Sequence, residues 1–284
     1  MAPLVWFITG CSSGFGRALV EQILARGDRV IATVRRPESV DDLKASGAAI
    51  LQLDVCSDQK SIDDTMAKAI AIYGHIDVLV NNAAYIAAGA WEDVSDEAFR
   101  ANFDTNVFGV LKVTKALLPH FRQRRSGTNV FISSRSGWWG DAFVGPYSGT
   151  KFALEGLAES LWRETEPLGI RTLMIEPGRF RTLLLSNTNL KVVQSAIPDY
   201  ARPSEEFSKM LATEDRTQPG DVDKGVSIII DLVRGEGVAD GKKIPFRLPL
   251  GTDCYESIKE KCEGTLRVLD EWKDVINSTD HAGL

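Results

Sequence analysis

The sequence is poor in the residues that build metal centres and disulfide frameworks. It contains only three histidines and four cysteines in 284 residues. The cysteines are scattered with neither metal-ligand nor redox-pair spacing, so we expect reduced thiols and no metal site. They are Cys11, Cys56, Cys254 and Cys262.

Long apolar runs and an excess of positive charge are also missing. No apolar stretch reaches the ~18 residues that a membrane-spanning helix needs, and the formal net charge is −6 with both signs interspersed. A chain without a basic stripe is poorly suited to neutralising nucleic-acid phosphates. The first apolar run begins at Leu4, which leaves no room for an export signal before it. We therefore expect a cytoplasmic protein that neither spans a membrane nor binds nucleic acid.

What remains is the composition of an ordinary globular protein, with 44% hydrophobic and 25% charged residues. Short apolar runs alternate with amphipathic helical stretches, a pattern typical of a parallel sheet flanked by helices. We predict one α/β domain over residues 1–284, with a doubly wound sheet of about seven strands. The expected strands are residues 4–9, 29–34, 49–53, 78–81, 128–133, 171–176 and 243–247. We also expect a helix that starts near Thr105 and enters its closing turn at Pro119.

A glycine-rich segment follows the first predicted strand. Residues 9–16 read Thr-Gly-Cys-Ser-Ser-Gly-Phe-Gly and precede a stretch with helical apolar spacing. Such a turn can bind a dinucleotide, because its glycines let the pyrophosphate approach the amides at a helix N-terminus, where the dipole favours anions. Glycine turns also occur without a ligand, so the motif gains weight only from the strand and helix beside it. We assign to the nucleotide Gly10, Ser12, Ser13, Gly14, Phe15 and Gly16.

A serine, a tyrosine and a lysine form the second motif. Tyr147 and Lys151 are one helical turn apart, and Ser134 ends the strand predicted over 128–133. The pKa of an unperturbed tyrosine, about 10, is too high for a base near neutrality. A nearby ammonium and a positively charged nicotinamide lower it by favouring the phenolate. We predict that Tyr147 exchanges a proton with a substrate whose oxygen is held by Ser134. Alone, the Tyr-x3-Lys spacing would more often mark a solvated helix face.

Together these motifs resemble those of the short-chain dehydrogenase/reductase family over nearly the whole chain. The resemblance implies a Rossmann-type fold and reversible hydride transfer between NAD(P) and a carbonyl or alcohol. It implies that Asn106 is a fourth catalytic residue, which kinks its helix and anchors a water relay to the lysine. Family members commonly pair through their long helices, so it also implies a homodimer or homotetramer. The matching elements are Thr9-Gly10-x3-Gly14-x-Gly16, Asp54, Asn81-Asn82-Ala83-Ala84, Asn106, Ser134, Tyr147-x3-Lys151 and Pro177-Gly178-x3-Thr182.

The same resemblance implies further cofactor contacts. Asp54 matches the residue beside the adenine ring, and Thr182 matches the one that closes over the nicotinamide carboxamide and the pyrophosphate. Phe15 and Ala84 depart from the family's usual aliphatic residue and glycine, but neither change removes a reacting group. The contacts implied outside the glycine loop are Asp54, Val55, Asn81, Ala83, Pro177, Gly178 and Thr182.

Charge at the end of the second strand indicates which nicotinamide cofactor is preferred. Enzymes that prefer NAD usually carry an acidic residue there, bound to the adenosine ribose. This sequence has Arg35 and Arg36 instead, which can bind a 2′-phosphate through charge-assisted hydrogen bonds. We predict NADP(H), with Arg35 as the main contact and Ser13 and Arg36 as helpers. The alternative is that the arginines are merely solvated loop charges.

The substrate side is less clearly marked. Trp138 and Trp139 lie between the serine and the tyrosine, and with Phe143 they are candidates for an aromatic wall of the substrate pocket. The indoles could equally pack in the core and at a subunit contact. Arg179 could bind an anionic substrate group or form a surface salt bridge. Residues 183–218 are predicted to form a mobile substrate lid whose closure excludes water.

Two segments of the chain resemble a subgroup of the family. Residues 246–251 and 30–35 are similar to segments of retinol and steroid dehydrogenases, which implies a lipophilic carbonyl substrate. Residues 252–275 are amphipathic and predict a C-terminal helical extension that covers the active site or a subunit interface.

Two other functions fit the same fold. The chain could be an isomerase, dehydratase or cyclase that uses the cofactor fold for redox-neutral chemistry. It could also be a regulator that binds NADP without turnover, although a sensor does not need a proton relay.

Overall fold

Seven parallel strands form the central sheet of the chain, which the computed structural model describes over residues 2–281. Their order is β3-β2-β1-β4-β6-β7-β9. The order reverses between β1 and β4, which is the switch point where such sheets bind ligands. The predicted doubly wound α/β fold is therefore confirmed. The strands are β1 (Val5–Thr9), β2 (Arg29–Val34), β3 (Ala49–Gln52), β4 (Val78–Asn81), β6 (Gly127–Ile132), β7 (Ile170–Pro177) and β9 (Arg247–Leu250).

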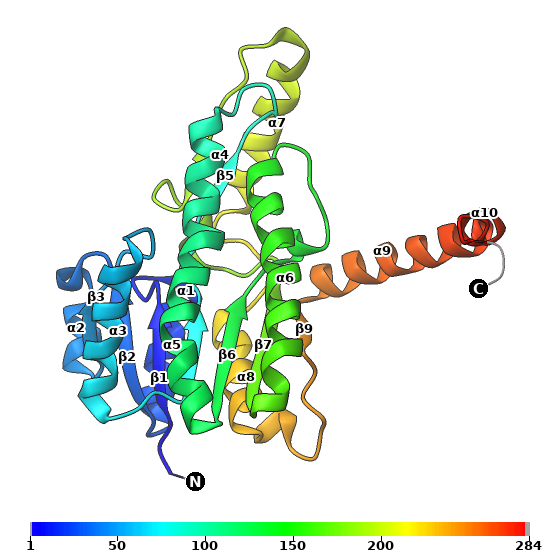
Figure 1. Ribbon diagram of the computed structural model, residues 1–284. Coiled ribbons are helices and arrows are strands. Elements are labelled where there is room, and N and C mark those ends of the chain that lie inside the picture. The colour runs from blue at the N-terminus through cyan, green and yellow to red at the C-terminus, as the bar shows by residue number, and fades with distance from the viewer. Residues whose placement is uncertain (1, 282–284) are drawn as a thin grey trace.

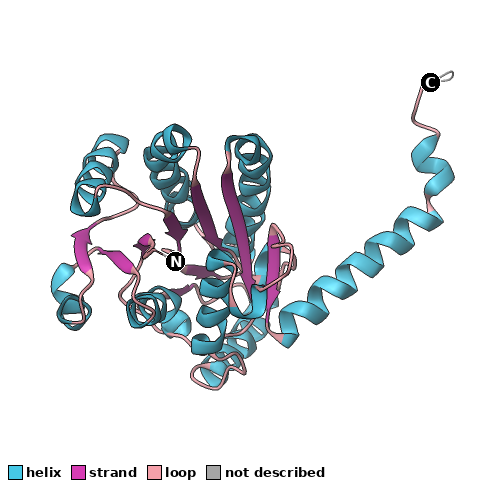
Figure 2. Ribbon diagram, turned by 90° about the horizontal axis from the view of Figure 1, so that it is seen from below, coloured by secondary structure: helices cyan, strands magenta, loops and turns pink. Residues whose placement is uncertain are grey.

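Helices cover both faces of the sheet (Figure 2), because the strands are apolar on both sides. In β1, Trp6 and Ile8 point into a core shared with α1 (Gly14–Ala25) and α8 (Val222–Arg234). Val5 and Phe7 alternate with them and face the opposite core. All four side chains have no exposed surface. The helices on that second face are α3 (Gln59–Tyr73), α5 (Val110–Arg124) and α6 (Gly145–Thr165).

Two predicted boundaries are wrong. The last strand was expected over residues 243–247, but β9 begins at Arg247 and pairs with β7 as far as Leu250. The strand was missed because Pro249 lies within it, and proline lacks the N–H that a central strand needs. At the sheet edge, where β9 lies, a missing N–H is tolerated. The helix expected to close around Pro119 continues to Arg124, because Leu117 and Phe121 remain fully buried on either side of the proline.

The helix that carries Asn106 also begins earlier than predicted. Helix α4 (Asp96–Phe103) runs directly into α5 through a π-helical turn, Asp104–Gly109. Such turns insert a residue into the helix and are frequent at functional sites. Asn106 lies within this turn, in agreement with the expected irregularity.

A smaller layer stands over the carboxyl ends of the central strands (Figure 1). Strand β5 (Ile86–Ala88) pairs in parallel with β8 (Leu190–Val192). Helix α7 (Pro198–Glu214) follows within the segment predicted as the lid, and a single bridge between Phe180 and Gly220 closes the base of the segment.

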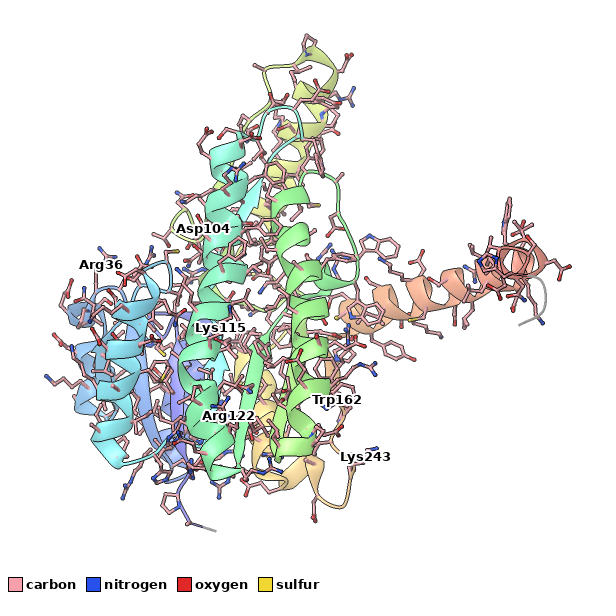
Figure 3. The ribbon with its side chains drawn as sticks, viewed as in Figure 1. Arg36, Asp104, Lys115, Arg122, Trp162 and Lys243 are labelled. Atoms are coloured by element: carbon pink, nitrogen blue, oxygen red, sulfur yellow. The ribbon has the colours of Figure 1, made fainter. Side chains whose placement is uncertain are left out.

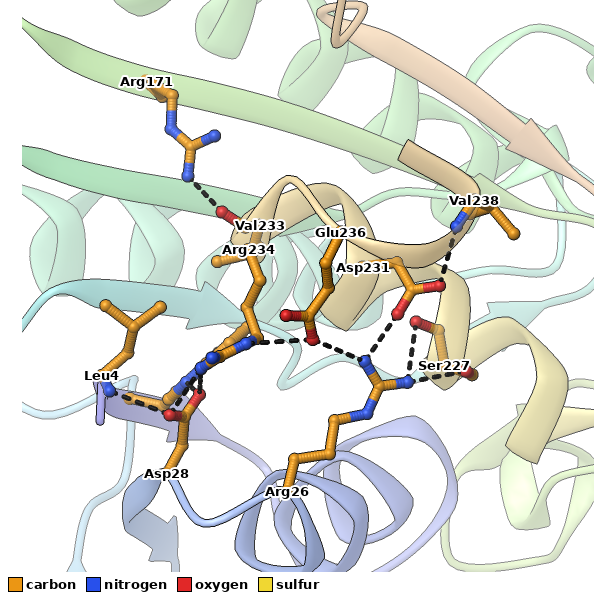
Figure 4. Close-up of polar contacts among 11 residues, drawn as sticks. Leu4, Arg26, Asp28, Arg171, Ser227, Asp231, Val233, Arg234, Glu236 and Val238 are labelled. Carbon is orange, nitrogen blue, oxygen red and sulfur yellow. Dashed lines mark hydrogen bonds and ion pairs between the residues drawn. The ribbon is translucent and has the colours of Figure 1, made fainter. Parts of the chain in front are cut away.

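The opposite end of the sheet is closed by charged side chains (Figure 4). Asp28 is buried and accepts hydrogen bonds from the Leu4 amide and the Trp6 indole, while Arg234 of α8 lies 2.6 Å from its carboxylate. Glu236 joins Arg234 to Arg26 at the end of α1. This network ties α1, β2 and α8 together away from the switch point.

The chain ends in helices that extend away from the body (Figures 1 and 2). They are α9 (Thr252–Glu271) and α10 (Lys273–Asn277). The start of α9 is anchored: Cys254 is fully buried, and Asp253 accepts a hydrogen bond from the Arg179 amide. Beyond this anchor the helix does not cover the active site, contrary to one of the two expectations. Within residues 2–281, no helix is long and apolar enough to cross a bilayer. The remaining α-helix within residues 2–281 is α2 (Asp41–Ala45).

Candidate active site

A cavity of about 1000 Å³ lies over the carboxyl ends of the central strands, between the glycine-rich loop and the lid. It is bordered at one end by Arg35 and at the other by leucine and aromatic side chains of the lid. Most predicted cofactor residues line it: Gly10, Ser12, Ser13, Gly14, Phe15, Arg35, Asp54, Val55, Ala83, Tyr147, Lys151, Pro177, Gly178 and Thr182.

The glycine loop is held against the turn that follows β4. A Cβ on Gly10, which has φ +72°, would lie 2.9 Å from the Cα of Ala83. At Gly16 a Cβ would lie 2.4 Å from the Gly10 carbonyl oxygen. Gly16 was expected to contact the cofactor, but it does not line the cavity. Its lack of a side chain instead allows α1 to pack closely against the loop.

Asn82 is the residue that sequence reasoning missed here. Its side-chain amide donates to the carbonyl oxygens of Thr9 and Gly10 over 2.9 and 3.0 Å, and it lines the cavity. The neighbouring Asn81, predicted as a cofactor contact, is buried and donates to Thr114 instead. Asn81 is the last residue of β4 and Asn82 follows the strand, and their side chains have different partners.

The N-terminus of α1 provides the amides suited to a pyrophosphate. Ser13 precedes the helix in an extended conformation, and within residues 2–281 its side chain makes no capping hydrogen bond. The first amides of the helix therefore face the cavity without a side-chain acceptor. Phe15 packs edge-on against Phe180, with ring centroids 5.1 Å apart, and so connects this helix to the base of the lid.

The two arginines after β2 occupy different positions. Arg35 lines the cavity, and its backbone oxygen accepts a hydrogen bond from the Gln52 side chain. Arg36 is exposed and lies outside the cavity (Figure 3). On this geometry Arg35 can meet a ligand at the adenosine end, whereas the helper role expected for Arg36 is not supported. Asp54 follows β3, the strand next to β2, and accepts a hydrogen bond of 2.9 Å from the Cys56 amide.

Tyr147, Lys151 and Ser134 meet where β6 ends beneath α6. The Tyr147 phenol lies near the Ser134 hydroxyl, and both side chains line the cavity. Lys151 Nζ donates to the Ile132 carbonyl oxygen over 2.8 Å and lies 5.6 Å from the centre of the Tyr147 ring. Tyr147 and Lys151 are 5% and 2% exposed, so their reacting groups are shielded from bulk water.

Asn106 stands behind these groups and does not line the cavity. Its amide donates to the Tyr85 carbonyl oxygen over 2.9 Å and to the Thr150 hydroxyl over 3.1 Å. Thr150 in turn donates to the Tyr147 carbonyl oxygen over 2.6 Å. Asn106 therefore fixes the backbone of α6 at the tyrosine, through protein groups.

The expected aromatic wall is only partly present. Phe143 lines the cavity and packs against Phe207 of α7, with centroids 5.6 Å apart. Trp138 and Trp139 do not line it. The Trp138 indole instead donates to Glu176 over 2.9 Å, because the turn after Ser134 directs it beneath the sheet edge. The lid supplies the apolar surface in their place, through Leu183, Leu184, Leu185, Phe207, Met210 and Leu211.

Thr182 and the Pro177-Gly178 turn close the centre of the cavity. The Thr182 hydroxyl accepts a hydrogen bond from the Leu184 amide, and its side chain borders Gly14. Arg179 lines the cavity but forms an ion pair of 2.5 Å with Glu214. This pairing fits the salt-bridge alternative for Arg179.

Residues 4–192 match the family model of short chain dehydrogenases, which is more than half of the chain. The chain belongs to the short-chain dehydrogenase family. It is 37% identical over 261 residues to the uncharacterized oxidoreductase YusZ of Bacillus subtilis, covering 88% of this chain and 90% of YusZ. It is also 39% identical over 188 residues to human retinol dehydrogenase 8, covering 62% and 59% of the two chains.

A solved structure extends the likeness to the whole fold. The short-chain dehydrogenase from Streptomyces avermitilis superposes with a TM-score of 0.86 at 38% identity, over 99% of this chain and 100% of that one. This chain is thus an oxidoreductase of the short-chain dehydrogenase family, whose fold binds a nicotinamide cofactor.

The residues present in this short-chain dehydrogenase fit such a cofactor. The helix amides at Ser13, the close-packed glycine turn and Arg35 border the same cavity as Tyr147. Ser12, Ser13 and Gly14 would hold the pyrophosphate, and Asp54 and Val55 would border the adenine.

Protein groups alone keep the tyrosine protonated. Burial raises the pKa of Tyr147 to about 12, against the smaller opposing effect of the Ser134 hydroxyl. The expected lowering toward neutrality is therefore not produced by the protein groups. Burial lowers the pKa of Lys151 to about 8, although the charge of Glu155 opposes this. A protonated phenol beside a lysine that titrates near neutrality is suited to donating a proton.

Proposed function

We propose that this short-chain dehydrogenase is an NADPH-dependent reductase of a bulky, lipophilic ketone or aldehyde. The observation that carries the proposal is the buried Tyr147 phenol, which lies beside the Ser134 hydroxyl and one turn from Lys151. It stands between an apolar lid and the Arg35 end of the cavity. The reverse oxidation would use the same residues.

Each side chain has a defined task in the reduction. A nicotinamide cofactor bound in the cavity would supply the hydride that reduces the carbonyl carbon. Ser134 donates a hydrogen bond to the carbonyl oxygen as negative charge develops there, and Tyr147 transfers its phenolic proton to that oxygen. Lys151 then favours the phenolate by its charge, and Asn106 holds the α6 backbone in place through Thr150.

The preference for NADPH is supported by the end of β2. The strand is followed by Arg35 in the cavity, with no carboxylate in the sequence from Ala32 to Arg36 to repel a 2′-phosphate. A guanidinium binds phosphate with two parallel hydrogen bonds.

The lipophilic substrate is supported by the lid. Leu183, Leu184, Phe207 and Met210 border the cavity, and such a surface favours an apolar ligand through burial of its hydrocarbon. The likeness to retinol dehydrogenase 8 supports the same substrate class, since retinol is a lipophilic alcohol.

The test is oxidation of NADPH and of NADH, followed by absorbance, with a panel of aromatic and alicyclic ketones and aldehydes. Turnover that prefers NADPH and is lost in Tyr147→Phe supports the reductase. Product without net cofactor oxidation indicates the redox-neutral alternative. Tight NADPH binding without turnover of any substrate indicates the regulator.

A further inference from the structure

A buried ionic cluster lies behind the catalytic lysine and has no part in the chemistry described above. Glu155 follows Lys151 by one turn on α6 and is 4% exposed, and Glu176 of β7 is 1% exposed. Arg247 of β9 lies 2.9 Å from Glu155 and 3.8 Å from Glu176. Carboxylates are rarely buried this fully unless they are paired.

The fold makes a specific place for Glu155. A Cβ on Gly137 would lie 2.9 Å from both the Cγ and the Oε1 of Glu155, so the position opposite the carboxyl has room only for glycine. The same Cβ would lie 3.0 Å from the Ser133 hydroxyl, next to the catalytic serine. The Glu155 side chain is thus enclosed directly beneath the turn that carries Ser134.

The remaining members hold Arg247 and Glu176 in position. The Trp138 indole donates to Glu176 over 2.9 Å, and the Arg247 guanidinium lies 5.3 Å from the centre of the Trp138 ring. Arg247 also pairs with Glu159 over 2.7 Å at the rim of the cluster. This explains the placement of Trp138 away from the cavity, since it supports the cluster.

Charge connects the cluster to Lys151. Burial lowers the pKa of the lysine, and the negative charge of Glu155 raises it. Burial raises the pKa of Glu155 in turn, against the opposing effects of Ser133, Arg247 and Lys151. Burial and repulsion by Glu155 raise the pKa of Glu176 to about 7. Glu155 is therefore the acidic group that opposes the loss of charge on Lys151.

We propose that Glu155 is a positioning residue for Lys151: its enclosed carboxylate, held by Arg247, keeps the catalytic ammonium charged over the pH range of reduction. The catalytic consequence rests on the function proposed above, whereas the electrostatic link between the two side chains does not. The titratable and charged groups around the pair are Tyr147 and Glu159 on α6, Glu176 on β7, Arg247 on β9, Cys254 on α9, and Arg135, which is itself paired with Asp141.

The direct test is the titration of Lys151 by NMR in protein with ¹³C-labelled lysine side chains. The Lys151 signal is identified by its absence in Lys151→Met. In Glu155→Gln, which removes the charge and keeps the shape, we expect its midpoint to fall by roughly one pH unit. The matched control is Glu159→Gln, which removes another carboxylate bound to Arg247 but one turn farther from the lysine. In this control we expect the Lys151 midpoint to stay unchanged.

A second variant keeps the test decisive if Glu155→Gln does not fold. Arg247→Gln removes the guanidinium whose charge favours the Glu155 carboxylate. Glu155 then ionises less readily, and the Lys151 midpoint should fall. An unchanged midpoint in Glu155→Gln, or a rise in Arg247→Gln, overturns the proposal.

Kinetics then tests the catalytic consequence. The alkaline limb of the pH profile of kcat should move to lower pH in Glu155→Gln, by the same amount as the NMR midpoint, and stay in place in Glu159→Gln. A merely structural role would lower kcat equally at every pH and would overturn the proposal. If the unaltered protein reduces no carbonyl, the proposed function fails, and the NMR titration still decides the role of Glu155.

Discussion

Lys151 donates a hydrogen bond of 2.8 Å to the carbonyl oxygen of Ile132, the last residue of β6. The bond directs the ammonium beneath Tyr147, in a place where the lysine is almost wholly shielded from water. Burial at this point lowers the pKa of Lys151 to about 8. The position proposed for the catalytic lysine therefore has a cost in stability.

Replacing this lysine should stabilise the fold while it removes activity. In the unfolded chain a lysine has a pKa of about 10.4. The folded protein binds this proton less tightly, because the pKa of Lys151 is about 8 there. Protonation of the lysine therefore lowers the free energy of unfolding. The free energy of unfolding consequently decreases as pH falls from about 10 to 8. We expect Lys151→Met to raise the free energy of unfolding at pH 7 by about 1–3 kcal/mol and to abolish turnover.

Urea unfolding at pH 7 and pH 9 measures this effect. The gain over the unaltered protein should be smaller at pH 9, and the control Lys115→Met, an exposed lysine on α5 (Figure 3), should change neither value. A Lys151→Met protein that is less stable than the parent at pH 7 would contradict the account.

Cofactor preference should depend on one of the two neighbouring arginines. Arg35→Ala removes the guanidinium that lines the cavity, and we expect the KM for NADPH to rise about tenfold or more. The KM for NADH should remain nearly unchanged. Arg36→Ala is the matched control and should leave both constants as they are, because this side chain lies outside the cavity. Equal effects of the two substitutions on the KM for NADPH would contradict the role assigned to Arg35.

Glycine 16 should tolerate no side chain. In Gly16→Ala the new Cβ would meet the Gly10 carbonyl oxygen at 2.4 Å, so the loop must shift. We expect a loss of about 1–3 kcal/mol in stability and weaker NADPH binding, measured by thermal unfolding and fluorescence titration. Gly156→Ala, on the exposed side of α6 with no atom within 4 Å of the new Cβ, should instead be neutral or slightly stabilising. Intact NADPH binding by Gly16→Ala would show that the loop can adjust.

The lid should discriminate substrates by size. Phe207 packs against Phe143 and borders the cavity, so Phe207→Ala removes apolar surface from the substrate side only. We expect KM to rise severalfold for bulky lipophilic carbonyls, with little change for a small ketone such as cyclohexanone. The ratio of the two kcat/KM values is the measurement, and a uniform loss for both substrates would point to a general role in folding.

Local patterns in the sequence were sufficient for the sheet and for much of the site. Six predicted strands, from residues 4–9 to 171–176, agree with the structure to within one residue at each end. Their strong apolar runs leave little ambiguity, and glycine, serine and tyrosine follow strand ends that parallel topology brings together. The last strand failed because Pro249 hides a pairing that only the edge of the finished sheet permits.

Side-chain direction could not be predicted in the same way. Asn81 and Asn82 are adjacent in the sequence, and only their contacts in the folded chain show that Asn82 meets the glycine loop whereas Asn81 meets Thr114. Trp138 donates to Glu176, and the guanidinium of Arg247, far along the chain, lies near the same carboxylate. Such choices depend on long-range contacts that no local motif records.

The most direct test of the central claim is the fate of the hydride. A bulky ketone that is turned over would be reduced with NADPH deuterated at the transferred position, and the alcohol analysed by mass spectrometry, with Tyr147→Phe as control. The account predicts one deuterium at the carbinol carbon and no product from the variant. Turnover that leaves the product free of deuterium, or full activity in Tyr147→Phe, would contradict it.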